Sequence, residues 1–274
     1  MEIVFDNRCL VVRSSVLNAL LVSDIHLGFH IELERLTRVA FPSEQASMLE
    51  QLQTMIRKYS VSALYVIGDF KHTITPDSSF NWETIPDFMK ELSREVETTI
   101  IPGNHDGAIE ALLPRKVKVA DVRGLVIGDD QDSIGLVHGH AWPSAEVLRP
   151  SMIVVGHNHP SLNRIRAVST RLNGRRNRRR SVGSMPVLLR SKLNKNCVRK
   201  SIGVPEDPVG VLMTLPSFNT LLSGIQVNRP DAKLQGPMFE SGCTDLGSSE
   251  VYSTDGVFLG KVDALQVSVD ETIK

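Results

Sequence analysis

Short apolar runs that end in polar turns recur through the first 160 residues, and each run predicts a buried β-strand. These runs cover residues 19–23, 61–68, 98–101, 134–138 and 151–156. Between them, residues 44–59 and 82–95 place apolar side chains at helical spacing, which predicts two amphipathic helices. Pro86 leaves the start of the second helix open. Strands that alternate with helices indicate a parallel sheet with right-handed crossovers.

The flanking segments follow a different pattern, in which short strands succeed one another without helices between them. Residues 2–5 and 8–13 predict two strands ahead of the first parallel strand. After residue 110, further strands are predicted at 116–128, 209–215, 222–228, 249–253 and 257–262. Residues 27–41 are predicted to be a connection. Together these elements predict an α/β fold.

At 274 residues the chain can bury a full core, and we expect one domain that spans residues 1–274. The cysteines Cys9, Cys197 and Cys243 are odd in number and widely spaced, which argues against a disulfide framework and for a reducing compartment. The N-terminus lacks the features of a signal peptide, and no apolar run reaches membrane-spanning length. We therefore expect a cytoplasmic protein with no membrane partner.

The net charge of zero conceals an uneven distribution of charge. Residues 1–160 carry 21 acidic and 14 basic residues, whereas residues 161–274 carry 10 acidic and 17 basic residues. A run low in apolar residues contains Arg175, Arg176, Arg178, Arg179 and Arg180. We predict that residues at about 164–183 form a basic, mobile insertion between strands. Contact with nucleic acid and a solvated loop without a partner are equally open interpretations of this run.

The strands predicted in the first 160 residues end in side chains that bind metals. Seven of the eight histidines lie in five such stretches, and none occurs after residue 159. In chain order the stretches contain Asp24 and His26, then Asp69 and His72, then Asn104, His105 and Asp106, then His138 and His140, and finally His157 and His159. Core histidines would not be expected to cluster in this way. The carboxyl ends of parallel strands are where open α/β sheets bind ligands. Imidazole and oxygen donors without a thiolate suit Mn, Fe, Co, Ni or Zn, so a transition-metal site is predicted.

Two of these stretches share a spacing. Asp24 and His26 lie two positions apart, and so do His157 and His159. Alternate residues of a strand point to one face, so we predict that both pairs face a common cavity. Asp69 has two carboxylate oxygens and can bridge two ions.

The order and spacing of these residues resemble those of the calcineurin-like metallophosphoesterases. The family's motifs are Asp-x-His, Gly-Asp, Gly-Asn-His-Asp/Glu, a single His and Gly-His-x-His. This chain has Asp24-x-His26, Gly68-Asp69, Gly103-Asn104-His105-Asp106, His138 and Gly156-His157-x-His159. The match covers about residues 19–160. It implies a four-layer α/β/β/α sandwich, in which two packed mixed sheets are flanked by helices and the later strands build the second sheet.

A narrower resemblance concerns the stretch Gly68-Asp69-Phe70-Lys71-His72, which is similar to the Gly-Asp-x-x-His of repair nucleases in this family. The chain resembles the SbcD-related phosphoesterases of archaea and bacterial phosphoesterases encoded beside DNA ligases and helicases. A repair ligase or helicase is therefore an expected partner.

The family resemblance also implies a set of metal ligands for two ions. The first ion would take Asp24, His26, Asp69 and His159, and the second would take Asp69, Asn104, His138 and His157. The resemblance to nucleases favours Mn²⁺, with Fe, Zn, Co or Ni as alternatives. His140 lies two positions from His138 and could be the ligand in its place.

Other residues of these motifs are implied to act on the substrate. His105 would be the acid that protonates the leaving oxygen or stabilises its charge. Asp106 would orient His105 or cap its turn. His72 would contact the phosphate or place the nucleic acid, and its alternative role is to support a metal ligand. Lys71 is interpreted as a surface lysine.

The expected function is hydrolysis of phosphodiester bonds by two metal ions, with nucleic acid as the substrate and DNA repair as the setting. The alternative is a phosphodiesterase or phosphatase that acts on nucleotides or on another small or protein substrate. The basic run favours nucleic acid, whereas the lack of the long capping domain of repair nucleases favours the alternative. A binding protein without turnover is disfavoured because the ligand set and His105 are intact.

Overall fold

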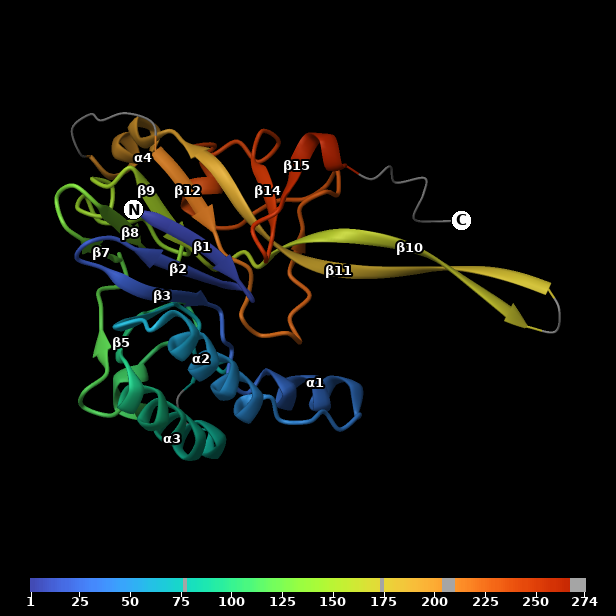
Figure 1. The fold of residues 1–274 in the computed structure, drawn as a ribbon, viewed down its shortest axis with the longest axis horizontal. Coiled ribbons are helices and arrows are strands. Elements are labelled where there is room, and N and C mark those ends of the chain that lie inside the picture. The colour runs from blue at the N-terminus through green and yellow to red at the C-terminus, as the bar shows by residue number, and fades with distance from the viewer. Residues whose placement is uncertain (76–77, 173–174, 204–209, 267–274) are drawn as a thin grey trace.

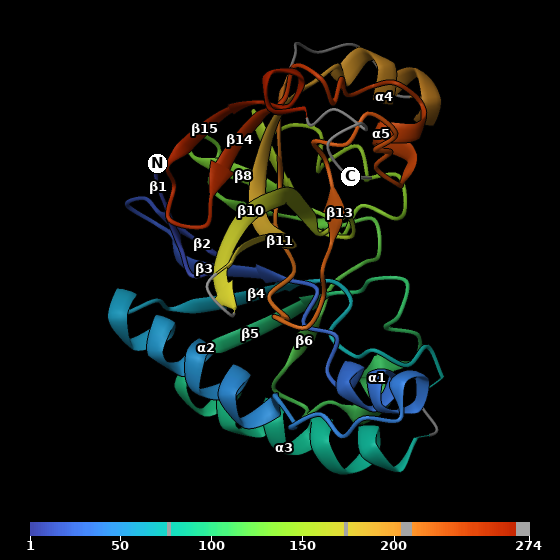
Figure 2. The same ribbon diagram turned by 90° about the vertical axis from the view of Figure 1, so that its right-hand side faces the viewer.

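Two β-sheets pack face to face, and helices cover the outer face of each sheet (Figure 1). The computed structural model describes residues 1–75, 78–172, 175–203 and 210–266, and for residues 165–182 it describes the backbone alone. Figure 2 shows the layers edge-on, with α2 and α3 beneath the first sheet and α4 and α5 beside the second. This arrangement confirms the predicted α/β fold with two mixed sheets.

The first sheet has the strand order β1-β2-β3-β4-β5-β6. Its strands are β1 (Glu2–Asp6), β2 (Cys9–Arg13), β3 (Asn18–Ser23), β4 (Ala63–Ile67), β5 (Glu97–Ile101) and β6 (Lys118–Val119). The first three strands pair in antiparallel fashion, and β3 to β6 run parallel to one another. The predicted alternation of strands and helices is therefore confirmed, because α2 (Gln45–Tyr59) and α3 (Ser79–Glu95) connect the parallel strands.

The strands of the first sheet are buried on both faces. In β3, Leu20 and Val22 pack with α2 and α3, whereas Ala19 and Leu21 pack against the second sheet. Opposite faces follow from the twofold alternation of side chains along a strand. This explains why β3 and β4 are continuous apolar runs in the sequence.

The second sheet has the order β13-β10-β11-β12-β9-β8-β7, and β14 also pairs with β11 and β15. Its strands are β7 (Leu125–Gly128), β8 (Ser133–Leu136), β9 (Met152–Val155), β10 (Pro160–Leu172), β11 (Arg175–Leu193), β12 (Gly210–Thr214), β13 (Ile225–Gln226), β14 (Glu250–Ser253) and β15 (Phe258–Lys261). Short helices complete the chain, namely η1 (Ile109–Leu112), α4 (Lys195–Ile202), α5 (Pro237–Glu240) and η2 (Val262–Leu265). The apolar side chains of α4 and α5 pack on the outer face of β9, β11 and β12.

The segment predicted as a loop at about 164–183 has a regular backbone instead. Strands β10 and β11 pair from Ser161 with Pro186 to Leu172 with Arg175, and the hairpin projects far from the two sheets (Figure 1). The paired backbone supplies the ladder hydrogen bonds that a loop would lack, and the β-branched residues of the segment favour strands. The mobility of the segment stays a prediction.

Two helices differ from the sequence prediction. Residues 27–41 were predicted to form a connection, but α1 (Phe29–Thr37) lies within them and buries none of its residues. Such a helix leaves only a weak periodic signal. The helix α3 begins before the predicted residue 82, because the side chain of Ser78 caps it by accepting a hydrogen bond from the backbone N–H of Asn81. Pro86 lies inside this helix and does not start it.

The cysteines also differ from the expectation. Cys197 in α4 and Cys243 form a disulfide with their Cα atoms 5.3 Å apart, while Cys9 is buried and free. The two partners are 46 residues apart, so their pairing depends on the tertiary fold and not on a local motif. The cysteines therefore no longer support a reducing compartment. Among the described helices, none combines the length and the apolar character needed to span a bilayer.

Candidate metal centre

The predicted ligands lie in loops that follow five strands, three from the first sheet and two from the second. Asp24 follows β3, Asp69 follows β4, and Asn104 follows β5. His138 and His157 follow β8 and β9 of the second sheet. The loops meet where the carboxyl ends of these strands converge, as predicted for an open parallel sheet.

Six of the seven predicted ligands form two compact groups. Asp24, His26 and His159 make one triad, and Asp69, His138 and His157 make the other. Within each triad the potential ligand atoms all lie within 4.8 Å of one another. This division matches the two ions that the sequence predicted, with three ligands for each.

Asp69 connects the two triads. Its Oδ2 atom lies 3.5 Å from Nε2 of His26 and 3.3 Å from Nε2 of His138. One carboxylate oxygen is therefore shared by a histidine of each triad. This is the position required of a bridging ligand.

Three histidine nitrogens of the two triads lack a hydrogen-bond partner. The Nε2 atoms of His26, His138 and His159 are buried and make no hydrogen bond. Nδ1 of His138 donates to the carbonyl oxygen of Ile67 at 3.0 Å, so Nε2 is the nitrogen left to face Asp69. Buried polar atoms are rarely left unpaired. Divalent cations would satisfy them, so the residues present fit a pair of metal ions.

The loops around the site are strained. Asp24, His26, Asp69, His157 and His159 all have positive φ values, between 43° and 69°. The prediction that alternate strand residues would face one cavity is therefore wrong in its reason, because β3 and β9 end before these residues. Asp and His enter this left-handed region more often than most residues. Left-handed turns, and not strand alternation, direct both pairs into the site.

Two motif glycines make room for the carboxylates. A Cβ atom on Gly103 would lie 2.1 Å from Oδ1 of Asp69, and one on Gly156 would lie 2.5 Å from Oδ2 of Asp24. Backbone N–H groups occupy the space instead. The N–H of His157 donates to both oxygens of Asp24, at 3.0 and 3.2 Å, and that of His105 donates to Oδ1 of Asp69 at 2.9 Å.

The electrostatics of the cluster suit a cation. Burial opposes the charge of Asp24, but His159, His138 and His26 hold its pKa below the ordinary value. Burial lowers the pKa of His26 to about 3 and that of His157 to about 4. For His138 burial acts in the same direction, yet the nearby carboxylates of Asp69 and Asp24 raise its pKa to about 9. Metal binding requires unprotonated imidazoles, and the low pKa values of His26 and His157 keep these two rings unprotonated near neutral pH.

Asn104 and His140 are the remaining candidate ligands. Asn104 lies in the turn that presents its neighbours to Asp69, and it is exposed. His140 was the alternative to His138. Its ring lies 5.2 Å from that of His138, and only His138 belongs to a triad, so the geometry favours His138.

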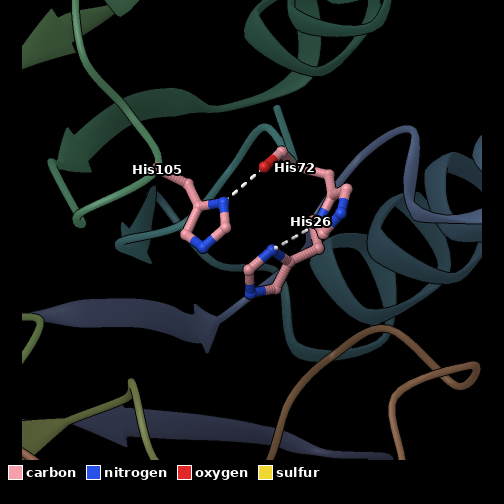
Figure 3. A group of neighbouring side chains, drawn as sticks. All are labelled: His26, His72 and His105. Atoms are coloured by element: carbon pink, nitrogen blue, oxygen red, sulfur yellow. Dashed lines mark hydrogen bonds between the residues drawn. The ribbon is translucent and has the colours of Figure 1, made fainter. Parts of the chain in front are cut away.

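His105 and His72 lie beside His26, a member of the first triad (Figure 3). Nδ1 of His105 donates to the backbone carbonyl of His72, and the ring of His105 packs edge-on against His26 at 4.9 Å. Nδ1 of His72 lies 3.3 Å from Nδ1 of His26, and its Nε2 lies 2.5 Å from Glu32. Both ring nitrogens of His72 are thus engaged, which favours its alternative role beside a metal ligand. Nε2 is the nitrogen of His105 left for a substrate.

Lys71 is not the surface lysine that the sequence suggested. It is fully buried, and its ammonium donates to the carbonyls of Thr73 and Ile74, at 2.7 Å each, and to that of His105. It therefore ties the loop after β4 to the turn after β5. No local signal in the sequence distinguishes such a lysine from an exposed one.

Asp106 fastens the same two loops. Its carboxylate accepts hydrogen bonds from the backbone N–H groups of Gly103, Lys71 and Phe70, at 2.9, 3.1 and 3.2 Å. Burial raises the pKa of Asp106, against the effect of these hydrogen bonds. Of its two predicted roles, capping the turn is therefore the one that the contacts support.

Asn219, which lies in none of the sequence motifs, holds the first ligand loop. Its amide donates to the carbonyls of Ile25 and His26, at 3.0 and 3.3 Å, and the hydroxyl of Ser217 donates to that of Asp24 at 2.7 Å. Residues nearly 200 positions away thus support the positive-φ backbone of the first motif. Because they lie so far from the first motif along the chain, no sequence signal relates them to it.

Comparison with known proteins adds independent findings. The family model described as calcineurin-like phosphoesterase matches residues 17–182, which is more than half of the chain. A search of curated proteins found no match.

Two solved structures match this chain, and the first of them shares its fold. The crystal structure of the nuclease MPE from Pseudomonas putida is 18% identical, covers 92% of each chain and has a TM-score of 0.53. A protein of unknown function from Aquifex aeolicus, AQ665, is also 18% identical, over 52% of this chain and 78% of its own, with a TM-score of 0.35.

Proposed function

The chain belongs to the calcineurin-like phosphoesterase family, and from this premise we propose that it cleaves phosphodiester bonds of nucleic acid with two divalent transition-metal ions. As a member of the family it is a hydrolase that acts on phosphoric ester bonds. The observation that carries the proposal is the bridging position of Asp69 between the two triads. Two adjacent cation sites are the arrangement that phosphatases and nucleases use.

The ligands divide between the ions as follows. One ion would be held by Asp24, His26, His159 and Asp69, and the other by Asp69, His138, His157 and Asn104. Bound there, the ions would polarise the phosphoryl group and lower the pKa of water. Mn²⁺ is the proposed metal because of the resemblance to nucleases, and the donors, imidazole and oxygen atoms without a thiolate, suit Fe, Zn, Co or Ni as well.

We assign protonation of the leaving group to His105. Its Nδ1–H is held by the carbonyl of His72, which fixes the ring, and the doubly protonated ring would give its Nε2 proton to the leaving oxygen. The role requires Nε2 to stand within hydrogen-bond reach of that oxygen. The position of His105 beside His26 supports this assignment.

The nucleic-acid part of the proposal rests on the β10–β11 hairpin. In its backbone register, Arg175, Arg176, Arg178, Arg179 and Arg180 pair with residues 167–172, toward the far end of the hairpin. The hairpin starts directly after His159, so at about 3.3 Å per residue these arginines lie roughly 20–40 Å from its base. Only a polymeric substrate would extend from the metal centre to such a distance.

Other observations support a nuclease. The nuclease MPE is matched over 92% of its length, which supports this activity. The narrower kinship with SbcD-related phosphoesterases, a place in DNA repair, and a ligase or helicase partner belong to the same proposal. A cytoplasmic location belongs to the same proposal as well.

The test is a substrate panel with the Mn²⁺-loaded protein. We expect cleavage of single- or double-stranded DNA or of RNA, together with a chromogenic phosphodiester, and no cleavage by Asp69→Asn. Replacement of the five hairpin arginines by Ser should weaken binding of nucleic acid and flatten its salt dependence, by about 0.7–0.9 in slope for each lost phosphate contact. Hydrolysis of the chromogenic diester should be unchanged.

A matched control removes five basic residues elsewhere. It replaces the surface residues Lys90, Arg94, Arg115, Lys116 and Lys118 by Ser. If this control and the hairpin variant lose the same affinity, the hairpin has no special role. If nucleotides are cleaved and polymers are not, the proposal gives way to a phosphodiesterase for small substrates.

A further inference from the structure

A chain of three side chains leads from the protein surface to the candidate metal centre. Oε2 of Glu32 lies 2.5 Å from Nε2 of His72, and Nδ1 of His72 lies 3.3 Å from Nδ1 of His26. Nε2 of His26 then faces Oδ2 of Asp69 at 3.5 Å and has no hydrogen-bond partner. Figure 3 shows the ring of His72 next to that of His26.

The first contact fixes the proton on His72. A carboxylate can only accept a hydrogen bond, so Nε2 of His72 must carry the proton that Glu32 accepts. A neutral His72 then offers a lone pair at Nδ1. Nδ1 of His26 must be the donor in the second contact, because each contact needs one donor and one acceptor.

The proton on Nδ1 of His26 determines the state of Nε2, on the opposite side of the ring. A neutral imidazole that carries its proton on Nδ1 has a lone pair on Nε2, and this is the atom aimed at Asp69. The reverse arrangement would place the proton on Nε2, where it would block a cation. The direction in which the hydrogen bonds run from Glu32 to His26 therefore decides whether His26 can act as a ligand.

We propose that Glu32 is a positioning residue, which through His72 holds His26 in the tautomer that can bind a metal ion. This inference rests on the proposed metal-dependent function and adds a residue outside all the family motifs. Glu32 lies in α1, which buries no residue, and its side chain is 42% exposed. The sequence predicts only a connection around Glu32, so the structure alone relates this residue to the site.

The inference also explains why α1 is placed beside the site. The helix begins after Gly28, whose positive φ of 96° redirects the chain directly after the first ligand loop. It is joined there to the loop after β4 by the bridge between Leu27 and Lys71. Glu32 and His72 are thus brought together by the same two loops that supply His26 and Asp69.

The test measures binding of Mn²⁺ to metal-free protein by calorimetry, for the wild type and for Glu32→Ala and Glu32→Gln. Loss of a residue that orients a metal ligand typically costs about 10–100-fold in affinity, so Glu32→Ala should weaken one of the two sites by that factor and spare the other. Glu32→Gln should lose less, because its amide oxygen can still accept from His72. The matched control is Glu34→Ala in the same helix, where the carboxylate accepts a hydrogen bond from the N–H of Phe41 and does not reach the site.

A second readout follows the tautomer itself. Nitrogen NMR of ¹⁵N-histidine-labelled, metal-free protein distinguishes protonated from unprotonated ring nitrogens, and His26→Gln identifies the signals of His26. We expect the proton on Nδ1 of His26 in the wild type and a mixture of tautomers in Glu32→Ala. A merely structural role of Glu32 would not change this distribution.

Three results would overturn the inference. The first is equal metal affinity in Glu32→Ala and Glu34→Ala. The second is a proton on Nε2 of His26 in the wild type. The third is a third bound ion that His72→Gln removes, since His26, His72 and His105 also lie close enough together to hold one. If the wild type binds no ion at all, the proposed function fails as well, so the two failures can be told apart.

Discussion

Replacement of Lys71 by Met would test how the two catalytic loops are held together. Methionine keeps a long unbranched side chain in a fully buried position but removes the ammonium. The carbonyls of Thr73, Ile74 and His105 then lose their shared donor. The loop that carries His72 and the turn that carries His105 are no longer joined by this group.

The size of the effect follows from where these carbonyls lie. Thr73 and Ile74 are exposed, so water can replace the ammonium at their carbonyls, whereas His105 is only partly exposed. We therefore count one lost hydrogen bond to a charged group, about 1.5–3 kcal/mol of unfolding free energy. Burial of the apolar methionine end returns about 1 kcal/mol. The expected net loss of stability is about 0.5–2 kcal/mol.

The assay combines denaturant unfolding with kinetics on a chromogenic phosphodiester. Because His105 loses a restraint but is not removed, we expect kcat to fall by roughly 10–100-fold, less than the 10²–10⁴ typical of a lost general acid, with both metals retained. Lys58→Met is the matched control, since Lys58 is an exposed lysine that pairs with Asp6. The reasoning is refuted if Lys71→Met is as stable and as active as Lys58→Met.

Three further changes give distinct outcomes. Asp69→Asn should lose both ions, since one carboxylate bridges the triads, and metal analysis showing one retained tight site would contradict this. His105→Ala should lower kcat strongly with both metals retained, and the fall in kcat should be smaller for a diester with a good leaving group. Loss of bound metal in this variant would make His105 a ligand. Reduction of the bond between Cys197 and Cys243 should lower the unfolding free energy by roughly 2–4 kcal/mol, measured by denaturation with and without a thiol reductant, and a Cys197→Ser variant should be insensitive to the reductant.

Sequence pattern predicted the parallel strands and the ligand loops because both depend on local signals. A doubly buried strand such as β4 is a continuous apolar run, and the ligand residues follow it directly. The two triads then arise because the carboxyl ends of five strands converge. The sequence could not show the left-handed turns that aim Asp24 and His26, since those depend on hydrogen bonds from residues as distant as Asn219.

The features that the sequence did not predict were missed for physical reasons of the same kind. The residues Glu32, Lys71 and Asn219 look like surface or turn residues because their partners are distant in sequence. The hairpin did have a local signal, since Asn173-Gly174 is a dipeptide typical of two-residue hairpin turns, although its own placement lies outside the described residues. High charge outweighed that signal in the prediction of a loop.

The backbone of the site argues that the ligand loops are shaped before a metal arrives. Each non-glycine residue held in the left-handed region costs of order 1–3 kcal/mol, and five predicted ligands are held there. The protein itself supplies hydrogen bonds that stabilise this geometry, from the backbone of His157 to Asp24 and from the amide of Asn219 to the carbonyl of His26. These bonds do not involve a cation. The fold therefore carries much of the cost of arranging the ligands, and the free energy of metal binding is left to hold the ions and the substrate.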